Sequence, residues 1–328
     1  MSPTLIAIII LALIYAFLNG INDSSSIVAT MISSRALSAR TARWMTALAE
    51  FLGPLAIGIA VAKTIGSVVV NPADISSQVI LAAILAAILW NLLTSFLGLP
   101  SSSSHALVGG LIGAVVLAAG IRAIQLTTLI KILLSLFLSP LVGFIIGVII
   151  LRIIMGLSWE ASPNIKNLFK RGQIFTVIAL GLSHSSNDAP KTMGVITLAL
   201  MTEKHLSTFI VPTWVILISA MAISTGTAVG RRRLVRTVGG KFYKIEPIDA
   251  FCSQLSSAIV LVISSLLGGP VSTTHVLSSS IVGVGAAERP NKVRWQITQE
   301  IATAWLMTIP IAALMAAGIF RLINPLFY

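Results

Sequence analysis

Two stretches of sequence decide the fold: Gly98-Leu99-Pro100-Ser101-Ser102-Ser103-Ser104-His105 and Gly269-Pro270-Val271-Ser272-Thr273-Thr274-His275, about 170 residues apart. In each, the proline can end one helix and open the next. Proline has no N–H group, and an N–H in the first turn of a helix would have no intrahelical partner anyway. The hydroxyl residues that follow are typical helix N-caps. Neither tip carries a charge, although both lie between apolar runs. We therefore expect two re-entrant helical hairpins whose tips stop inside a membrane and line a polar cavity.

The composition places the chain in a bilayer. Of 328 residues, 56% are hydrophobic and only 10% charged, with a mean hydropathy of +0.98, whereas globular chains are about half apolar and about a quarter charged. Runs such as 79–97 and 133–151 are long enough to cross about 30 Å of hydrocarbon. These features predict an all-α polytopic membrane protein and exclude a soluble enzyme. The first apolar run lacks a charged leader and a cleavage site, so we expect it to be retained.

The net charge of +12 does not indicate a nucleic-acid partner, because most of the 22 basic residues lie in short loops between apolar runs. The single cysteine, Cys252, excludes an intramolecular disulfide. Four histidines without a second thiolate do not form a zinc-type cluster, and we expect no cofactor beyond bound sodium ions.

A second motif is also repeated. Asn19-Gly20-Ile21-Asn22-Asp23-Ser24-Ser25-Ser26 matches Ser183-His184-Ser185-Ser186-Asn187-Asp188-Ala189-Pro190, about 165 residues later. Two motifs recurring in the same order predict a duplication, with one membrane repeat at 1–160 and another at 161–328. Each repeat is predicted to contain an Asn-Asp helix, a plain helix, a hairpin and a closing helix. The expected spans are 3–34, 45–70, 79–119, 132–153, 172–200, 208–230, 248–287 and 295–321.

Loop charges orient these spans. With both hairpins re-entrant, one side of the membrane receives 15 basic loop residues and the other receives 3. By the positive-inside rule the first side is cytoplasmic, and both termini of this multi-pass cell-membrane protein are outside. The two Asn-Asp segments then run in opposite directions, so the repeats are inverted. Inverted repeats with interrupted helices are typical of secondary transporters, whose substrate site lies near the midplane.

The two tips predict an anion site. Two helix N-termini facing one cavity would each contribute about half a positive charge as well as N–H and O–H donors. The alternative is that these residues only cap helices or pack between them. The candidate ligands are Ser101, Ser102, Ser103, Ser104, Ser272, Thr273 and Thr274.

The Asn-Asp pairs predict a cation site. Asp23 and Asp188 fall within apolar segments, where a carboxylate is costly unless it is paired or lines a watery cavity. Neighbouring amides and hydroxyls add neutral oxygens, a ligand set that suits a hard cation. The alternative is a structural aspartate at a broken helix. The candidate cation ligands are Asn22, Asp23, Ser26, Asn187 and Asp188.

Other polar residues in the apolar runs leave several interpretations open. Glu50 and Lys63 share one span and could pair, or Lys63 could snorkel. Lys191, one turn after Asn187, either neutralises Asp188 or stands as a fixed charge near the anion. With the serines and Asp23, His105 and His275 permit a Ser-His-Asp interpretation as an intramembrane hydrolase. We favour no enzymatic role, because no Gly-x-Ser-x-Gly motif is present and we expect the histidines to orient the tips by hydrogen bonds.

These four motifs resemble those of the inorganic phosphate transporter (PiT) family. Ser33-Ser34-Arg35-Ala36-Leu37-Ser38 and 191–200 are similar to its bacterial branch, and the likeness extends from about residue 15 to 320. The resemblance implies two inverted repeats with re-entrant hairpins, a homodimer, and phosphate uptake coupled to sodium or protons. It also implies that Asn22, Asp23, Asn187 and Asp188 bind cation and phosphate, and that the two tips bind phosphate, with Asp23 and Asp188 as substrate contacts.

The chain departs from the family motif three residues after each aspartate, where asparagine is common and Ser26 and Lys191 stand here. A hydroxyl can still ligate sodium, whereas an ammonium cannot. We hypothesise that the Lys191 charge fills the second cation position, which would leave fewer sodium ions or a proton as the coupling species.

The predicted function is import of inorganic phosphate by sodium or proton symport through alternating access. A sulfate or other oxyanion permease of the same fold is the nearest alternative, because tetrahedral oxyanions fit the same donors. An anion channel is a more distant alternative, which interrupted inverted helices disfavour.

Overall fold

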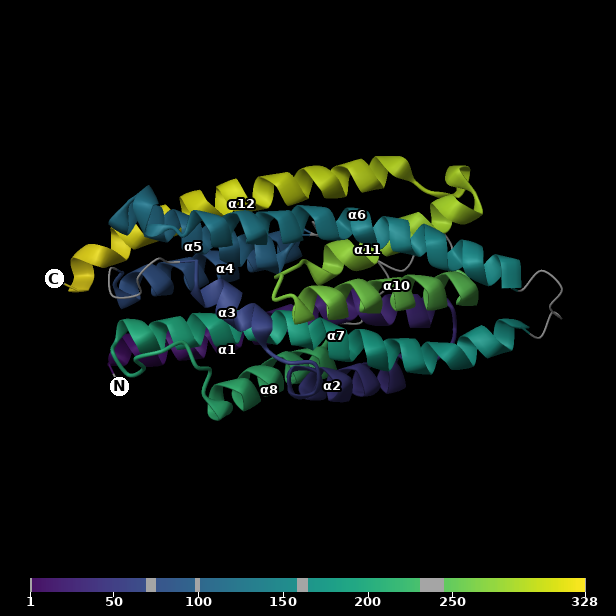
Figure 1. Cartoon of the computed structure of the whole chain (residues 1–328), viewed down its shortest axis with the longest axis horizontal. Coiled ribbons are helices and arrows are strands. Elements are labelled where there is room, and N and C mark those ends of the chain that lie inside the picture. The colour runs from purple at the N-terminus through teal and green to yellow at the C-terminus, as the bar shows by residue number, and fades with distance from the viewer. Residues whose placement is uncertain (1, 69–74, 98–100, 158–164, 231–244, 328) are drawn as a thin grey trace.

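The computed structural model describes residues 2–68, 75–97, 101–157, 165–230 and 245–327. Every regular element within these ranges is helical (Figure 1). The side chains of residues 24–26, among others, lie outside the description. The main helices are α1 (Pro3–Ser33), α2 (Ala39–Ala56), α3 (Ala60–Gly66), α4 (Ser77–Leu97), α5 (Ser103–Ala119), α6 (Leu126–Leu157), α7 (Ile165–Thr202), α8 (Thr213–Val229), α10 (Pro247–Leu266), α11 (Thr273–Glu288) and α12 (Trp295–Ile323).

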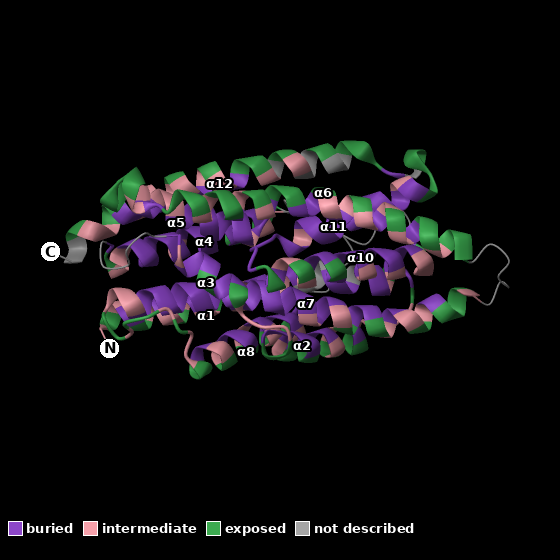
Figure 2. Cartoon of the chain, viewed as in Figure 1, coloured by how far each residue is buried: buried purple, intermediate pink, exposed green. Residues whose placement is uncertain are grey.

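Within the described ranges, five helical segments are long and apolar enough to cross a membrane, and α2 with α3 makes a sixth if the bent pair is one span. Large apolar side chains such as Leu134, Phe175 and Leu314 are exposed. Exposed residues gather on the outer faces of the helices (Figure 2), where a bilayer would cover apolar side chains. The polar motifs lie instead in the buried centre of the molecule. The prediction of an all-α polytopic membrane protein is confirmed.

The two ends of the molecule are distinguished by the chain termini and by the junction between two long helices (Figure 1). Both termini lie at one end, while α6 ends and α7 begins at the other. α1 runs away from the termini and α7 runs back towards them, so the two Asn-Asp helices have opposite directions. The boundary between repeats near residue 160 remains a prediction, because it falls at the α6–α7 junction, outside the described residues.

The predicted hairpins at 79–119 and 248–287 appear as α4 with α5 and α10 with α11. The first pair occupies the half of the molecule near the termini and the second the opposite half (Figure 1). α5 packs against α12, and α11 packs against α6. The N-termini of α5 and α11 consequently meet at the middle of the molecule, where Ser104 Oγ on one tip donates to the Val271 carbonyl of the other at 2.9 Å.

The prediction of a single plain span at 45–70 is wrong. Residues 39–44 already belong to α2, and the helix stops at Ala56 before α3 starts at Ala60 with a bend of 75°. Two residues explain the break. Pro54 cannot donate to the helix ladder, and Gly58 has φ +112°, a conformation that residues with a Cβ rarely adopt.

Candidate functional site

The centre of the candidate site is the middle of α7, where Asp188 is almost fully buried. Its Oδ2 accepts a hydrogen bond from Thr273 Oγ1 at 3.0 Å and lies 2.8 Å from His184 Nε2. Its Oδ1 is paired with the ammonium group of Lys191, which also lies on α7. Both oxygens of the carboxylate are thus satisfied by protein groups, as a buried charge requires.

Lys191 is completely buried and joins three elements. Besides Asp188, its Nζ donates to Ser104 Oγ on the α5 tip at 2.5 Å and to the Val271 carbonyl on the α11 tip at 2.7 Å. Of the two interpretations left open by the sequence, neutralisation of Asp188 is the one that these contacts favour.

His184 links Asp188 to a second helix. Its Nδ1 lies 2.7 Å from Glu50 Oε1 on α2, and both side chains are fully buried. The close approach of α2 to α7 depends on Gly53, where a Cβ would come within 2.1 Å of Ser185 Oγ and 2.3 Å of the Leu182 carbonyl. The suggested pairing of Glu50 with Lys63 is not observed among the described residues: Glu50 is buried beside His184, whereas Lys63 is exposed on α3.

Asp23 on α1 approaches the same histidine from the other side, with Oδ2 3.6 Å from His184 Nε2. Its Oδ1 accepts a hydrogen bond from Thr274 Oγ1 at 2.6 Å, while Oδ2 has no hydrogen-bond partner among the described residues. One ligand atom each from Asp23, His184 and Asp188 lies within 4.8 Å of the others. This trio has the chemistry and spacing to hold a cation.

Asn187 fixes the α11 tip against α7. Its Nδ2 donates to the Gly269 carbonyl at 3.1 Å, and its Oδ1 accepts from the Val271 N–H at 3.0 Å. The adjacent Thr273 and Thr274 can then reach the two aspartates. Asn187 is among the predicted cation ligands, and in this conformation its amide hydrogen-bonds to the backbone of the tip.

The remaining predicted ligands lie around this centre. Ser102 and Ser272 are the N-caps of α5 and α11, each accepting from the backbone N–H of the histidine three residues later. Ser101 accepts from Trp90 Nε1 at 2.7 Å, and the Ser103 carbonyl accepts from Tyr15. Asn22 accepts a long hydrogen bond of 3.5 Å from Ser95. The side chain of Ser26 and the whole of Pro100 lie outside the described residues.

His105 and His275 do not orient the tips through ring hydrogen bonds, so that prediction is wrong. All four of their ring nitrogens lack a hydrogen-bond partner among the described residues. The two rings instead lie 4.8 Å apart, and His275 stacks on Trp305 at 3.8 Å between ring centroids. The histidines therefore pack the two helix starts together by ring contacts.

Sequence reasoning missed two participants. His184 stands in a quoted motif, and its position four residues before Asp188 places both on one helix face, a signal that was available. The Val271 carbonyl carries no signal in the sequence, because only the fold determines which backbone oxygen points into a site.

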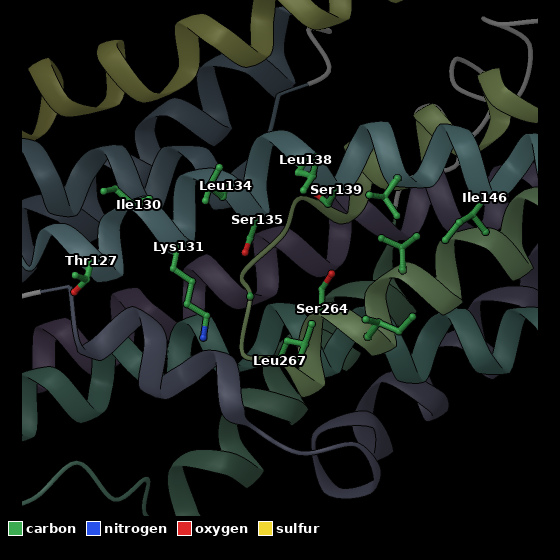
Figure 3. Close-up of a pocket in the computed structure, with 14 residues that line it drawn as sticks. Thr127, Ile130, Lys131, Leu134, Ser135, Leu138, Ser139, Ile146, Ser264 and Leu267 are labelled. Carbon is green, nitrogen blue, oxygen red and sulfur yellow. The ribbon is translucent and has the colours of Figure 1, made fainter.

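One cavity, of about 510 Å³, lies outside this centre between α6 and α10 (Figure 3). Its walls are mainly apolar, with Leu134, Leu138 and Leu267 among the lining residues and Lys131 at one side. Gly269, which precedes the α11 tip in the chain, is also among the lining residues. Its apolar lining makes it unsuited to an inorganic ion.

Buried helix starts, two neighbouring aspartates and two hairpins in opposite halves of the molecule are features typical of a helical membrane transporter. The chain belongs to the phosphate transporter family, whose model matches residues 19–162 and 157–316.

Relatives in other organisms match over nearly their whole length. The chain is 39% identical to a probable low-affinity inorganic phosphate transporter of Rhizobium meliloti (strain 1021), covering 96% of this chain and 95% of that protein. It is 40% identical to a protein of the same description from Bacillus subtilis (strain 168), covering 98% of each. A solved structure described as the sodium-dependent phosphate transporter has the same fold, with a TM-score of 0.90, 24% identity, and coverage of 99% of this chain and 100% of that one.

Proposed function

We propose that this protein imports inorganic phosphate by cation symport through alternating access, without a catalytic step. The observation that carries the proposal is the meeting of two helix N-termini beside two aspartates. Thr273 and Thr274, in the first turn of α11, hydrogen-bond to Asp188 and Asp23. Donors from α5 and α11 suit an oxyanion, and carboxylates beside them suit the cation that accompanies it.

Phosphate would bind where the free N–H groups at the starts of α5 and α11 converge. The first N–H groups of a helix have no intrahelical partner, so they can replace part of the hydration shell that the anion loses. The threonine hydroxyls that now contact the aspartates can turn to phosphate when a cation takes over those carboxylates. That exchange would make phosphate binding depend on the cation, which is the condition for coupling.

Sodium is the coupling ion we favour. Asp23 Oδ2, which has no hydrogen-bond partner among the residues that the structure describes, lies near His184 and Asp188, and carboxylate oxygen is a ligand that hard cations prefer. The similar solved structure is described as sodium-dependent. Uptake coupled to protons would contradict sodium as the coupling ion, and transport of sulfate would contradict phosphate as the substrate.

Alternating access would follow from the opposite directions of α1 and α7 and the opposite entry of the two hairpins. We extend the proposal to two inverted repeats divided near residue 160, and to termini outside the cell membrane. This orientation rests on the 15 basic residues in the sequence stretches 35–43, 156–171, 231–247 and 288–294, against 3 on the other side. The homodimer implied by the family resemblance remains part of this proposal.

The test is uptake of labelled phosphate into proteoliposomes, with sodium and pH gradients imposed separately and excess sulfate as competitor. We expect an inward sodium gradient to drive uptake that sulfate leaves intact. Asp23→Asn should reduce sodium-driven uptake by at least about tenfold, because loss of one charge-assisted contact is worth about 1.5–3 kcal/mol. Uptake driven only by the pH gradient would replace sodium by protons, and gradient-independent flux would replace the symporter by a channel.

A further inference from the structure

The two aspartates of the site differ in the groups that neutralise them. Asp188 is paired with Lys191, whereas no lysine or arginine is paired with Asp23 among the residues that the structure describes. The residue three positions after Asp23 is Ser26, and the residue three positions after Asp188 is Lys191. The duplicated motif therefore provides one carboxylate with a built-in cation and one without.

The surroundings of the Lys191 ammonium resemble those of a small bound cation. Its Nζ contacts three oxygens of different kinds: the Asp188 carboxylate, the Ser104 hydroxyl and the Val271 carbonyl. Carboxylate, hydroxyl and backbone carbonyl oxygens are the ligands that proteins offer to hard metal ions. They come from α7 and from both hairpin tips, so the ammonium holds together the elements that a central ion would hold.

These contacts also use all the donors that lysine has. An ammonium carries three N–H bonds, and three protein oxygens accept them. In this conformation none remains for a phosphate oxygen. Lys191 thus acts in the structure as a partner of Asp188 and of the tips, and not as a ligand that awaits the anion.

We propose that the Lys191 ammonium permanently occupies the second cation position of the site, so that sodium binds only at Asp23. The inference rests on the proposed phosphate symport and specifies its ion stoichiometry. A fixed charge neutralises Asp188 in every state of the cycle without being released, which leaves one sodium ion per phosphate where an unoccupied pair of aspartates would take two.

The deciding variant is Lys191→Asn, which replaces the ammonium by a neutral ligand and frees Asp188 for a second sodium ion. We expect the Hill coefficient for sodium to rise from about 1 to about 2, since it is limited by the number of sites. Phosphate uptake should rise more steeply with sodium concentration and should persist at high sodium. Lys131→Asn, at an exposed lysine on α6, is the matched control and should leave the coefficient unchanged.

Thermal unfolding in detergent gives a second measurement that does not need transport. Lys191→Asn removes the ammonium partner of the buried Asp188 carboxylate, which costs about 3–5 kcal/mol unless a cation replaces the lysine. We expect the melting temperature of this variant to rise on exchange of choline chloride for sodium chloride by several degrees more than that of the wild type. If Lys191→Asn does not fold, Asp188→Asn/Lys191→Asn removes both charges and should fold with the sodium response of the wild type.

The outcomes separate the two proposals. If the wild-type protein transports phosphate with sodium but Lys191→Asn leaves both the Hill coefficient and the sodium-dependent melting shift unchanged, the Lys191 inference is overturned. The same holds if the variant only raises the KM for phosphate at every sodium concentration, because lysine would then be a phosphate ligand. If the wild-type protein fails to transport phosphate under any gradient, the proposed function itself fails.

Discussion

The Asn-Asp segments of α1 and α7 present the same chemical motif in two different electrostatic settings. Each aspartate accepts a hydrogen bond from a threonine in the first turn of α11, and each approaches His184, at 3.6 Å for Asp23 and 2.8 Å for Asp188. Asp188 has both oxygens satisfied and a lysine beside it, whereas Asp23 Oδ2 has no hydrogen-bond partner within the described part of the chain. The repeated motif thus places its two aspartates in surroundings that differ in charge.

Among the variants that test the difference between Asp23 and Asp188, Asp188→Asn should have the largest effect. The change leaves the Lys191 ammonium buried without a carboxylate, at a cost of about 3–5 kcal/mol, and we expect a large fall in melting temperature and loss of uptake. Thermal unfolding of the purified protein measures the fall in melting temperature. Asp188→Asn/Lys191→Met, which removes both charges, should recover most of the stability. A double variant as unstable as the single one would contradict the pairing.

An intermediate effect is expected from His184→Gln. Glu50 would lose its close contact, and hydrogen bonds to charged groups contribute about 1.5–3 kcal/mol each. Because His184 also lies beside both aspartates, sodium affinity should fall by about tenfold or more, measured as the sodium concentration for half-maximal uptake. Lys63→Gln on α3, whose charge lies outside this contact, serves as the control. Equal sodium affinities in the two variants would show that His184 has no part in cation binding.

The smallest effect should distinguish the two threonines of the α11 tip. Thr273→Val and Thr274→Val each remove one hydroxyl donor to a carboxylate, worth about 1–2 kcal/mol, while keeping the side-chain shape. We expect Thr274→Val to change sodium dependence by about fivefold, because its partner Asp23 is the open position. Thr273→Val should mainly lower the melting temperature. Identical profiles would indicate that the aspartates are equivalent after all.

Much of the fold was predictable because its signals are local. Apolar runs of bilayer length predict spans, and proline followed by hydroxyl residues predicts a helix start, so both hairpins and their N-caps Ser102 and Ser272 could be anticipated. The break after Ala56 was missed since neither Pro54 nor Gly58 interrupts the hydropathy of the run.

The site was predicted less completely, because its contacts join distant parts of the chain. The aspartates, the tip residues and Lys191 could be chosen by their polarity in apolar surroundings. Their partners could not: Glu50 meets His184 across 134 residues, and Lys191 meets Ser104 across 87. The histidine rings also follow tertiary packing, which placed His275 against Trp305 and not in a hydrogen bond.

The sequence by itself determined that this chain is a helical membrane protein of the phosphate transporter family with two repeated motifs and charged residues in its apolar segments, because composition, span length and motif repetition are properties of the linear chain. Only the tertiary structure decided how those charges are distributed. Which aspartate is neutralised depends on whether a lysine ammonium can reach it together with two other oxygens, and that is set by the packing of α7 against both hairpin tips.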